Sequence, residues 1–489
     1  MSLGQSIRSG AAWLFIGNTG SQALTFIFGI ALARLLAPAD FGMLMTIAIF
    51  TGIAGFISGG GMGQALVRAK DATKHDYDIV FTMQIIIGSL IYAGFFFAAP
   101  WLAKWYNTPL YTDLLRVSTL SFIFRPFVNL PNSILYRNMR FKEQITVGLV
   151  SLIISSTVSI GMAYTGYGVW SLIFGGIAGS VANMCMLIPL AKWRPGFSLE
   201  FRRGRDIARY GLMVTVTDFL VYLRMQASVF ILSRTLGPAS VGLYNKGESL
   251  AKMPHTFITH SVYHALFRAM ASEQGNLDKC RYLFFRSISL VAVYATPFYV
   301  GLFWLAEPFI NGVYGPKWAA ASAPLLILTL AWPFWLMENL SGAVLAAMNW
   351  LDRELTVQFS ALIITSLAVI IGLPLGIEGV AYGIVCASIY TALYMLWLAI
   401  GCLKASWLAY FHALIPATIL NTILTGVLFL VDHTMPIILR ASDLTYAALM
   451  GITGGLVYSV CFLYLPIDAL QSERQRWKIK LHLSDKGTS

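Results

Sequence analysis

Runs of about 20 apolar residues recur from one end of this chain to the other, and a helix of that length crosses the hydrocarbon core of a bilayer. The composition agrees, because 57% of the 489 residues are hydrophobic and only 11% are charged, whereas soluble domains carry about 25% charged residues. The runs are continuous rather than alternating, which favours helices over a barrel. We therefore expect an all-α polytopic membrane protein with about 14 transmembrane helices.

Charge placement predicts the topology of these helices. Most of the 34 lysine and arginine residues fall in segments on one side of the membrane, and the positive-inside rule makes that side, with both termini, cytoplasmic. The densest basic runs, Lys192–Arg209 and Ser472–Lys480, are interpreted as topology signals on anionic lipid, so no nucleic-acid partner is expected despite the net charge of +12. The expected spans are residues 11–33, 41–64, 79–103, 117–136, 145–165, 169–191, 210–233, 245–267, 288–312, 321–347, 355–375, 379–402, 409–431 and 444–465.

A polar sequence element recurs two hundred residues along the chain. "RLLAPADFGML" occupies Arg34–Leu44, and the similar "RTLGPASVGLY" occupies Arg234–Tyr244. In the same way, "GYGVW" at Gly166–Trp170 resembles "GIEGVAY" at Gly376–Tyr382. An internal duplication explains both echoes. The repeat length holds about six spans, an even number, so the two repeats are expected to be related by an axis along the membrane normal. Proline and glycine then end the first helix of each repeat and allow the chain to reverse.

The duplication defines the expected domains. They are a six-helix N-lobe at 1–191, a basic cytoplasmic connector at 192–209, a six-helix C-lobe at 210–403, two further spans at 404–465, and a basic cytoplasmic tail at 466–489.

Five motifs in this order resemble a known family: "LARLLAPADFG", "YRNMRFKEQ" at Tyr136–Gln144, "GYGVWSL", "RTLGPASVGLYN" and "VYGPKW" at Val313–Trp318. The chain resembles a Wzx-type polysaccharide flippase of the colanic acid and exopolysaccharide kind, in the multidrug/oligosaccharidyl-lipid/polysaccharide (MOP) exporter superfamily. The resemblance implies two six-helix bundles, two extra helices, and movement of a polyprenyl-pyrophosphate-linked oligosaccharide from the inner to the outer leaflet of a bacterial inner membrane. Membrane lipids and a polymerase or export complex are the other partners that it implies. Where such relatives carry an acidic residue in the seventh span, this chain has Ser228.

Three cations inside the expected spans are candidates for the pyrophosphate: Arg125, Arg224 and Lys252. A charge in the hydrocarbon costs roughly 2.5–3.5 kcal/mol on insertion scales and normally faces protein or a water-filled cavity. A guanidinium fork matches phosphate geometry, and lysine supplies a mobile point charge. The alternative for Lys252 is an i, i+4 ion pair with Glu248. The alternative for Arg224 is a structural pair with Asp218, although about 240° separates the two around one helix.

Other polar side chains share the faces of these cations or lie on the first span, and they suit sugar hydroxyls in a polar central cavity. They are Asn129 and Asn132 with Arg125, His255 with Lys252, and Asn18 and Gln22 on the first span. Three intramembrane acids, Asp218, Glu248 and Glu338, are candidates to bind a coupling proton or sodium ion, with structural pairing as the alternative for each. Prolines inside spans, Pro333 among them, are expected either to bend helices for function or to form merely structural kinks.

Competing functions differ in the charges or domains they need. A multidrug or organic-cation antiporter should carry acids in its first-lobe cavity, yet the first six expected spans hold no Asp or Glu. Flipping of the peptidoglycan lipid precursor is an alternative function that the charge distribution does not exclude. A membrane glycan polymerase or other enzyme usually needs a long loop or domain, and no outside loop exceeds about 15 residues. The sequence predicts no enzyme, no cofactor and, from its five cysteines and its histidines, no metal site.

Overall fold

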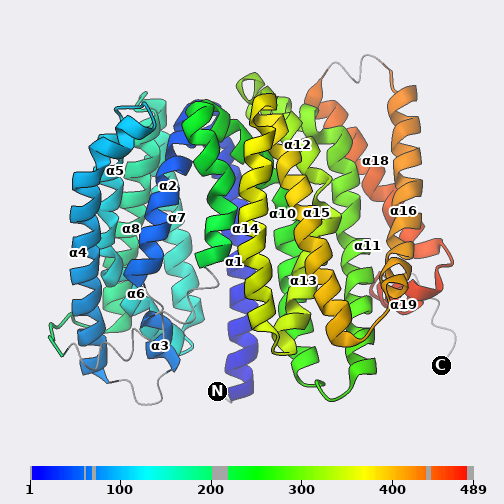
Figure 1. The fold of residues 1–489 in the computed structure, drawn as a ribbon, viewed down its shortest axis with the longest axis horizontal. Coiled ribbons are helices and arrows are strands. Elements are labelled where there is room, and N and C mark those ends of the chain that lie inside the picture. Colours follow the sequence, from blue (N-terminus) through cyan, green and yellow to red (C-terminus); the bar gives the residue numbers. More distant parts are fainter. Residues whose placement is uncertain (1–2, 60–61, 69–72, 201–218, 437–441, 482–489) are drawn as a thin grey trace. The chain divides into compact units, whose positions relative to one another are not determined.

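The computed structural model describes residues 3–59, 62–68, 73–200, 219–436 and 442–481, and divides the chain into two compact units, Met1–Gly242 and Leu243–Ser489. Helices dominate both units (Figure 1). The first contains α1 (Leu3–Leu35), α2 (Pro38–Gly59), α3 (Met62–Arg68), α4 (Lys74–Trp105), α5 (Tyr111–Thr119), α6 (Ser121–Arg137), α7 (Phe141–Tyr164), α8 (Val169–Ala191), a helix at residues 219–235, and the start of α10 (Gly237–Ala271).

The second unit continues α10 and holds the remaining helices. They are α11 (Leu277–Phe309), a π-helical turn at Ile310–Tyr314, a 3-10 turn at Pro316–Ala321, α12 (Ser322–Thr329), α13 (Trp332–Ala347), α14 (Leu351–Gly372), a 3-10 turn at Leu373–Leu375, α15 (Gly376–Leu403), α16 (Trp407–Thr434), α18 (Asp443–Tyr464), a 3-10 turn at Asp468–Leu470, and α19 (Gln471–Lys480).

The expected all-α polytopic architecture is confirmed. Every expected span coincides with helical residues in the described part of the chain. By length and apolar composition, eight stretches of the described residues are able to cross a membrane, or nine with one bent pair. One of the eight, Leu351–Leu403, contains α14 and α15, which pack against each other. The expected lobe boundary at residues 192–209 stays a prediction.

In the first unit, α6 is held closely between its neighbours. It packs against α4 and α8, and a Cβ placed on Gly88 of α4 would lie only 2.6 Å from the carbonyl oxygen of Phe122. Glycine therefore lets the α4 and α6 backbones approach closely. Pro126 and Pro131 lie inside α6, and both are buried. This packing fixes the helix that carries Arg125.

In the second unit, the two appended helices pack on α11. Both α16 and α18 contact α11 and each other, and the Tyr458 hydroxyl of α18 donates a 2.5 Å hydrogen bond to the Val293 carbonyl of α11. Buried side chains such as Phe284, Ile288 and Leu420 form the core. The sequence could not show that these extra helices share the core of the second unit.

The expected span at 321–347 is broken into two helices. Residues 316–329 and 332–347 meet at a bend of 54°. Pro333 lies in the first turn of α13, where its missing N–H costs no helical hydrogen bond. A bend at this proline is confirmed, which leaves open whether it serves movement or is only structural.

The recurrent turn motifs contact one another directly within the first unit. A Cβ on Gly42 would lie 1.7 Å from the Pro238 carbonyl oxygen, and a Cβ on Gly242 would lie 1.9 Å from the Pro38 carbonyl oxygen. The two contacts are reciprocal, so each glycine accommodates the proline of the other motif. The motifs are therefore structural partners at one crossing, which explains why both keep proline and glycine.

Two further loop motifs contact residues in or directly beside the repeated turns. A Cβ on Gly168 of "GYGVW" would lie 3.2 Å from the carboxylate of Asp40, which accepts a hydrogen bond from the backbone N–H of Ala37 at 2.9 Å. In the second unit, the Lys246 ammonium lies 4.7 Å from the ring centre of Tyr314 and 5.1 Å from that of Trp318. "VYGPKW" thus supplies an aromatic wall for the lysine that directly follows "RTLGPASVGLYN" in α10.

Candidate functional site

Arg125 is the candidate whose surroundings are described most fully. It lies in α6 with an exposed side chain, although α6 occupies an expected span. Its guanidinium carbon is 5.3 Å from the ring centre of Phe122. Within the described ranges the structure records no acidic partner for it. An exposed cation without a counter-ion at this depth is expected to face a polar, water-filled space.

Two glycines of α2 make room for side chains that pack against this helix, those of Arg125 and Tyr222. A Cβ on Gly55 would lie 2.7 Å from Nη1 of Arg125, so the guanidinium rests against the α2 backbone. A Cβ on Gly52 would lie 1.8 Å from the Tyr222 hydroxyl, which donates a 2.7 Å hydrogen bond to an α2 carbonyl. Sequence reasoning missed this glycine face, because glycine inside an apolar run resembles any other small residue.

Arg224 lies two residues after Tyr222, on the helix at residues 219–235, and its side chain is half-buried. Because the 219–235 helix places Tyr222 against α2, and two residues correspond to about 200°, Arg224 projects from a different face. Asp218, its expected structural alternative, lies outside the described residues. Ser228 is only 1% exposed, so this chain has a buried hydroxyl where the resemblance implies an acid.

In the second unit, Lys252 forms the ion pair that was its alternative interpretation. Its Nζ lies 2.6 Å from Oε1 of Glu248, which is 8% exposed. The ammonium also lies 5.7 Å from the Trp335 ring centre. In this conformation the Glu248 carboxylate is therefore paired with Lys252. A role of Lys252 in holding pyrophosphate stays a prediction that must include release from this pair.

His255 is surrounded by aromatic rings. Its own ring lies 5.7 Å from that of Trp332 and 6.2 Å from that of Trp335, and its backbone N–H donates to the Tyr299 hydroxyl at 3.1 Å. The His255 side chain is therefore packed against aromatic residues.

The amide side chains predicted to contact sugar in the first unit differ in hydrogen bonding and exposure. Asn132 accepts a 2.6 Å hydrogen bond from Nε2 of Gln144, a residue of the "YRNMRFKEQ" motif, and so links α6 to α7. Asn129 is half-buried on the same helix, and Gln22 is exposed on α1. The side chain of Asn18 lies outside what the structure describes. Their contact with sugar stays a prediction.

Glu338 has a second acid in its neighbourhood. It is half-buried on α13, and one turn later a Cβ on Gly342 would lie 3.8 Å from Oε1 of Glu354 on α14. Glu338 and Gly342 are four residues apart and share one face of α13, so the Glu354 carboxylate approaches that face. Glu354 precedes the expected span at 355–375 by one residue, so the sequence did not mark it as an intramembrane acid. Ion binding at Glu338 stays a prediction.

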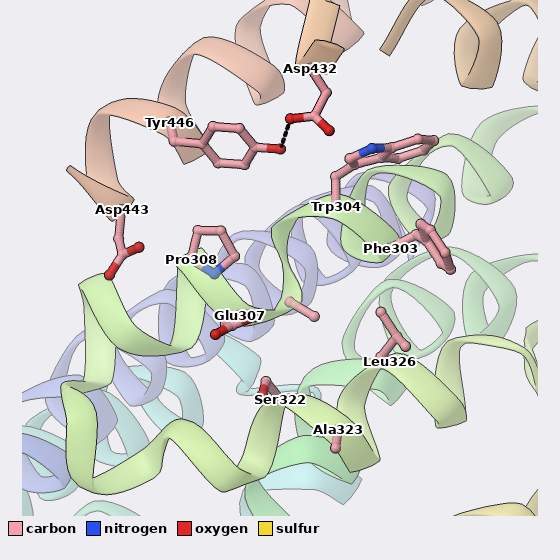
Figure 2. A pocket seen from close by; sticks show the side chains of 11 residues that line it. Phe303, Trp304, Glu307, Pro308, Ser322, Ala323, Leu326, Asp432, Asp443 and Tyr446 are labelled. Carbon is pink, nitrogen blue, oxygen red and sulfur yellow. Dashed lines mark hydrogen bonds between the residues drawn. The ribbon is translucent and has the colours of Figure 1, made fainter. Parts of the chain in front are cut away.

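A separate cavity of about 580 Å³ lies among α11, α12, α16 and α18 (Figure 2). Glu307, Asp432 and Asp443 line it together with Trp304 and Tyr446, whose hydroxyl donates to Asp432 at 2.9 Å. No lysine or arginine is among its described lining residues. Because three carboxylates repel an anion, this cavity is unsuited to pyrophosphate, and the candidate cations of the site lie elsewhere.

The fold matches solved transporters over nearly its whole length. A structure of the lipid II flippase MurJ in an inward closed conformation superposes with a TM-score of 0.73 at 18% identity, covering 91% of this chain and 96% of that one. An inward-facing multidrug resistance MATE family transporter of the MOP superfamily superposes with a TM-score of 0.60 at 17% identity, covering 78% of this chain and 95% of that one. The chain therefore has the helical fold of these membrane proteins.

Sequence comparison narrows the class. The chain belongs to the polysaccharide biosynthesis protein family, whose model matches residues 31–323. It is 23% identical over 327 residues to the succinoglycan biosynthesis transport protein ExoT of Rhizobium meliloti (strain 1021), covering 67% of this chain and 66%, slightly under two thirds, of that relative. It is 23% identical over 360 residues to the lipopolysaccharide biosynthesis protein WzxC of Escherichia coli (strain K12), covering 72% of each chain. It is 21% identical to the teichuronic acid biosynthesis protein TuaB of Bacillus subtilis (strain 168), covering 99% of this chain and 100% of that relative.

Proposed function

We propose that this protein flips polyprenyl-pyrophosphate-linked oligosaccharide repeat units from the inner to the outer leaflet by alternating access, for assembly of an exopolysaccharide or O-antigen. The observation that carries the proposal is Arg125, an exposed cation with no acidic partner in the described structure, seated against α2 inside a transporter of the polysaccharide biosynthesis family. A guanidinium in this setting is suited to a pyrophosphate, because its planar fork pairs with phosphate oxygens and stays protonated.

The placement of acids supports an anionic substrate over an organic cation. Four acids of the first unit, Asp40, Asp76, Asp113 and Glu143, each lie in a first helical turn. Carboxylates at helix N-termini are stabilised by the helix dipole, so these acids have a structural role. The exposed intramembrane charge of α6 is positive.

The protein is proposed to act in a bacterial inner membrane, with no catalytic chemistry of its own. A proton or sodium gradient is the proposed coupling, with Glu338 as the candidate ion-binding residue. A polymerase or export complex on the far side is the proposed recipient of the flipped unit. The structure's likeness to a lipid II flippase keeps the peptidoglycan precursor as the rival substrate.

A deletion strain tests the function directly. We expect lipid-linked repeat units to accumulate in the inner leaflet and polymer export to stop, while growth of cells unable to initiate the repeat unit is unaffected. Leaflet-specific labelling of the lipid-linked glycan, with export measured beside it, gives the result. Accumulation of peptidoglycan precursor with cell lysis would instead identify the rival substrate, and normal export would contradict the proposal.

Topology gives a second test. With both termini cytoplasmic, reporters fused after Lys480 are expected to read as cytoplasmic, and reporters inserted within Gly315–Trp318 as periplasmic, because basic segments remain inside. Fusions on both sides should be compared at equal protein levels. An external reading after Lys480 would overturn the proposed orientation.

A further inference from the structure

A second cavity, of about 600 Å³, lies in the first unit where α4 begins and where α6 and α8 end. This volume is typical of a small-molecule site. Four basic residues line it, with Tyr77 and Trp193: they are Lys74, Arg137, Lys192 and Arg194. No acidic residue is among its described lining residues. The charge of the cavity is therefore strongly positive, the opposite of the acidic cavity of the second unit.

The basic residues come from three elements, and three of the four are exposed cations at the cavity. Lys74, Lys192 and Arg194 are exposed, and for each of them the described structure records no acidic partner. Two acids nearby have other partners. Asp78 accepts the Gly196 N–H at 3.2 Å, and Glu200 lies 3.0 Å from Nε2 of His75.

A buried donor in the wall of the cavity also lacks an acceptor. Trp193 is only 5% exposed, and its ring packs edge-on against Phe81, with 5.3 Å between ring centres. Its indole Nε1–H is buried and has no hydrogen-bond partner among the described residues. A buried unpaired donor costs about 1–3 kcal/mol, so an acceptor supplied by a ligand would stabilise it.

The wall that carries Trp193 and Arg194 is held in place by the chain that follows it. Beyond the Gly196 bond, the N–H of Ser198 donates to the Thr82 hydroxyl at 2.9 Å, which ties this segment to α4. A Cβ on Gly196 would lie 2.6 Å from the Asp78 carboxylate, so glycine permits the close approach. Lys192 ends α8 in a left-handed conformation with φ of 51°, which turns the chain toward α4.

We propose that this cavity binds the phosphate-bearing headgroup of a membrane-anchored lipid, at the face that the proposed topology makes cytoplasmic. The basic side chains supply charge-assisted hydrogen bonds to the phosphate oxygens, and the Trp193 N–H supplies a further donor. Two lipids share this chemistry: an anionic phospholipid of the inner leaflet, and the diphosphate of a polyprenyl carrier before it enters the transport path. The site is distinct from Arg125, and its binding does not depend on the proposed flipping.

Binding to the purified full-length protein in phosphatidylcholine nanodiscs tests the proposal. One arm titrates farnesyl diphosphate, and the other uses native mass spectrometry to compare retention of phosphatidylglycerol with that of phosphatidylcholine. Both arms use an Arg125→Ala background, so that the proposed transport site contributes less to the binding. We expect saturable binding of at least one phosphate-bearing lipid, weakened by added salt. Preference for the diphosphate indicates loading of the carrier, and preference for phosphatidylglycerol indicates a structural lipid.

Three variants localise the binding. Lys192→Ala and Trp193→Phe are each expected to weaken it by about tenfold, because each removes one hydrogen bond to a charged group. Trp193→Phe retains an aromatic ring against Phe81, so the wall should remain packed. Lys404→Ala is the matched control, because Lys404 also ends an apolar helix in a left-handed conformation, with φ of 49°, but does not line this cavity.

Equal binding by the wild type, Lys192→Ala and Trp193→Phe would overturn the proposal, as would failure of both lipids to bind. These outcomes are separate from the function test. A deletion strain that exports polymer normally would refute flipping and would not change the result of the lipid-binding experiment.

Discussion

Polysaccharide export is expected to be lost when Arg125 is replaced by glutamate, while the protein remains in the membrane. Truncation to alanine removes a charge-assisted contact of roughly 1.5–3 kcal/mol, so affinity for the lipid-linked substrate should fall by roughly tenfold to a hundredfold. Arg125→Lys should recover only part of the loss, because a point charge does not reproduce the planar fork. The measurements are complementation of export and the amount of protein in the membrane. Arg224→Ala is expected to act in the same direction and by a similar factor.

Arg116→Ala is the matched control for the loss of an arginine. Arg116 lies in the same unit, also against an aromatic ring, with its guanidinium carbon 4.2 Å from the Phe96 ring centre. It belongs to α5, outside the polar face of α6, and its Nε donates to a backbone carbonyl of α4. Normal export by well-expressed Arg125→Ala and Arg224→Ala variants would show that these arginines are structural, and the pyrophosphate would need another site.

Gly55→Ala probes the same site without removing a charge. The added methyl meets the mobile end of Arg125, so the helix should tolerate it while the guanidinium moves. A reduced affinity is expected in the wild-type background and no further reduction in an Arg125→Ala background, because a double-mutant cycle isolates the coupling of neighbours. Equal effects in both backgrounds would show that Gly55 acts through packing alone.

The fold was largely predictable because membrane insertion leaves a strong local signal. Each span needs about 20 apolar residues, so run length alone located the helices. Pro333 also marked a bend locally, because proline lacks the N–H that a continuous helix needs and is tolerated in a first turn. Contacts between distant elements leave no such signal. The repeated motifs revealed a relation between Pro38 and Pro238 but not that Gly42 and Gly242 would touch.

The candidate site was predictable only where one helix contains both partners. The spacing of Glu248 and Lys252 predicted their ion pair as one alternative, and the structure contains it. Hydrogen bonds between helices could not be derived from spacing, which is why the link between Asn132 and Gln144 was missed. The cavity around Trp193 was missed for another reason. Lys192 and Arg194 belong to a basic run that was interpreted as a topology signal, and Lys74 and Arg137 are far from it in the sequence. Only the fold brings them together around a buried indole donor.

The crossing of the two repeated turns is expected to be the most sensitive glycine contact of the first unit. Gly42→Ala would place a methyl 1.7 Å from the Pro238 carbonyl oxygen, and Gly242→Ala would place one 1.9 Å from that of Pro38. Both neighbours are backbone atoms, which cannot rotate away as a side chain can. Overpacking of this kind costs about 1–3 kcal/mol and occasionally more. We expect the upper end of that range, measured as a lower unfolding temperature in detergent and a smaller amount of protein in the membrane.

Reciprocity at the crossing predicts how the two substitutions combine. Because either methyl must separate the same pair of turns, the second should cost much less than the first, and the double variant should resemble the more damaging single one. Gly29→Ala and Gly94→Ala are the controls, since a Cβ at either position meets no atom within 4 Å, and alanine in a helix is favoured over glycine by up to about 1 kcal/mol. Full additivity would mean that the two glycines act independently. Wild-type stability of Gly42→Ala would show that the turns do not cross as closely as the structure places them.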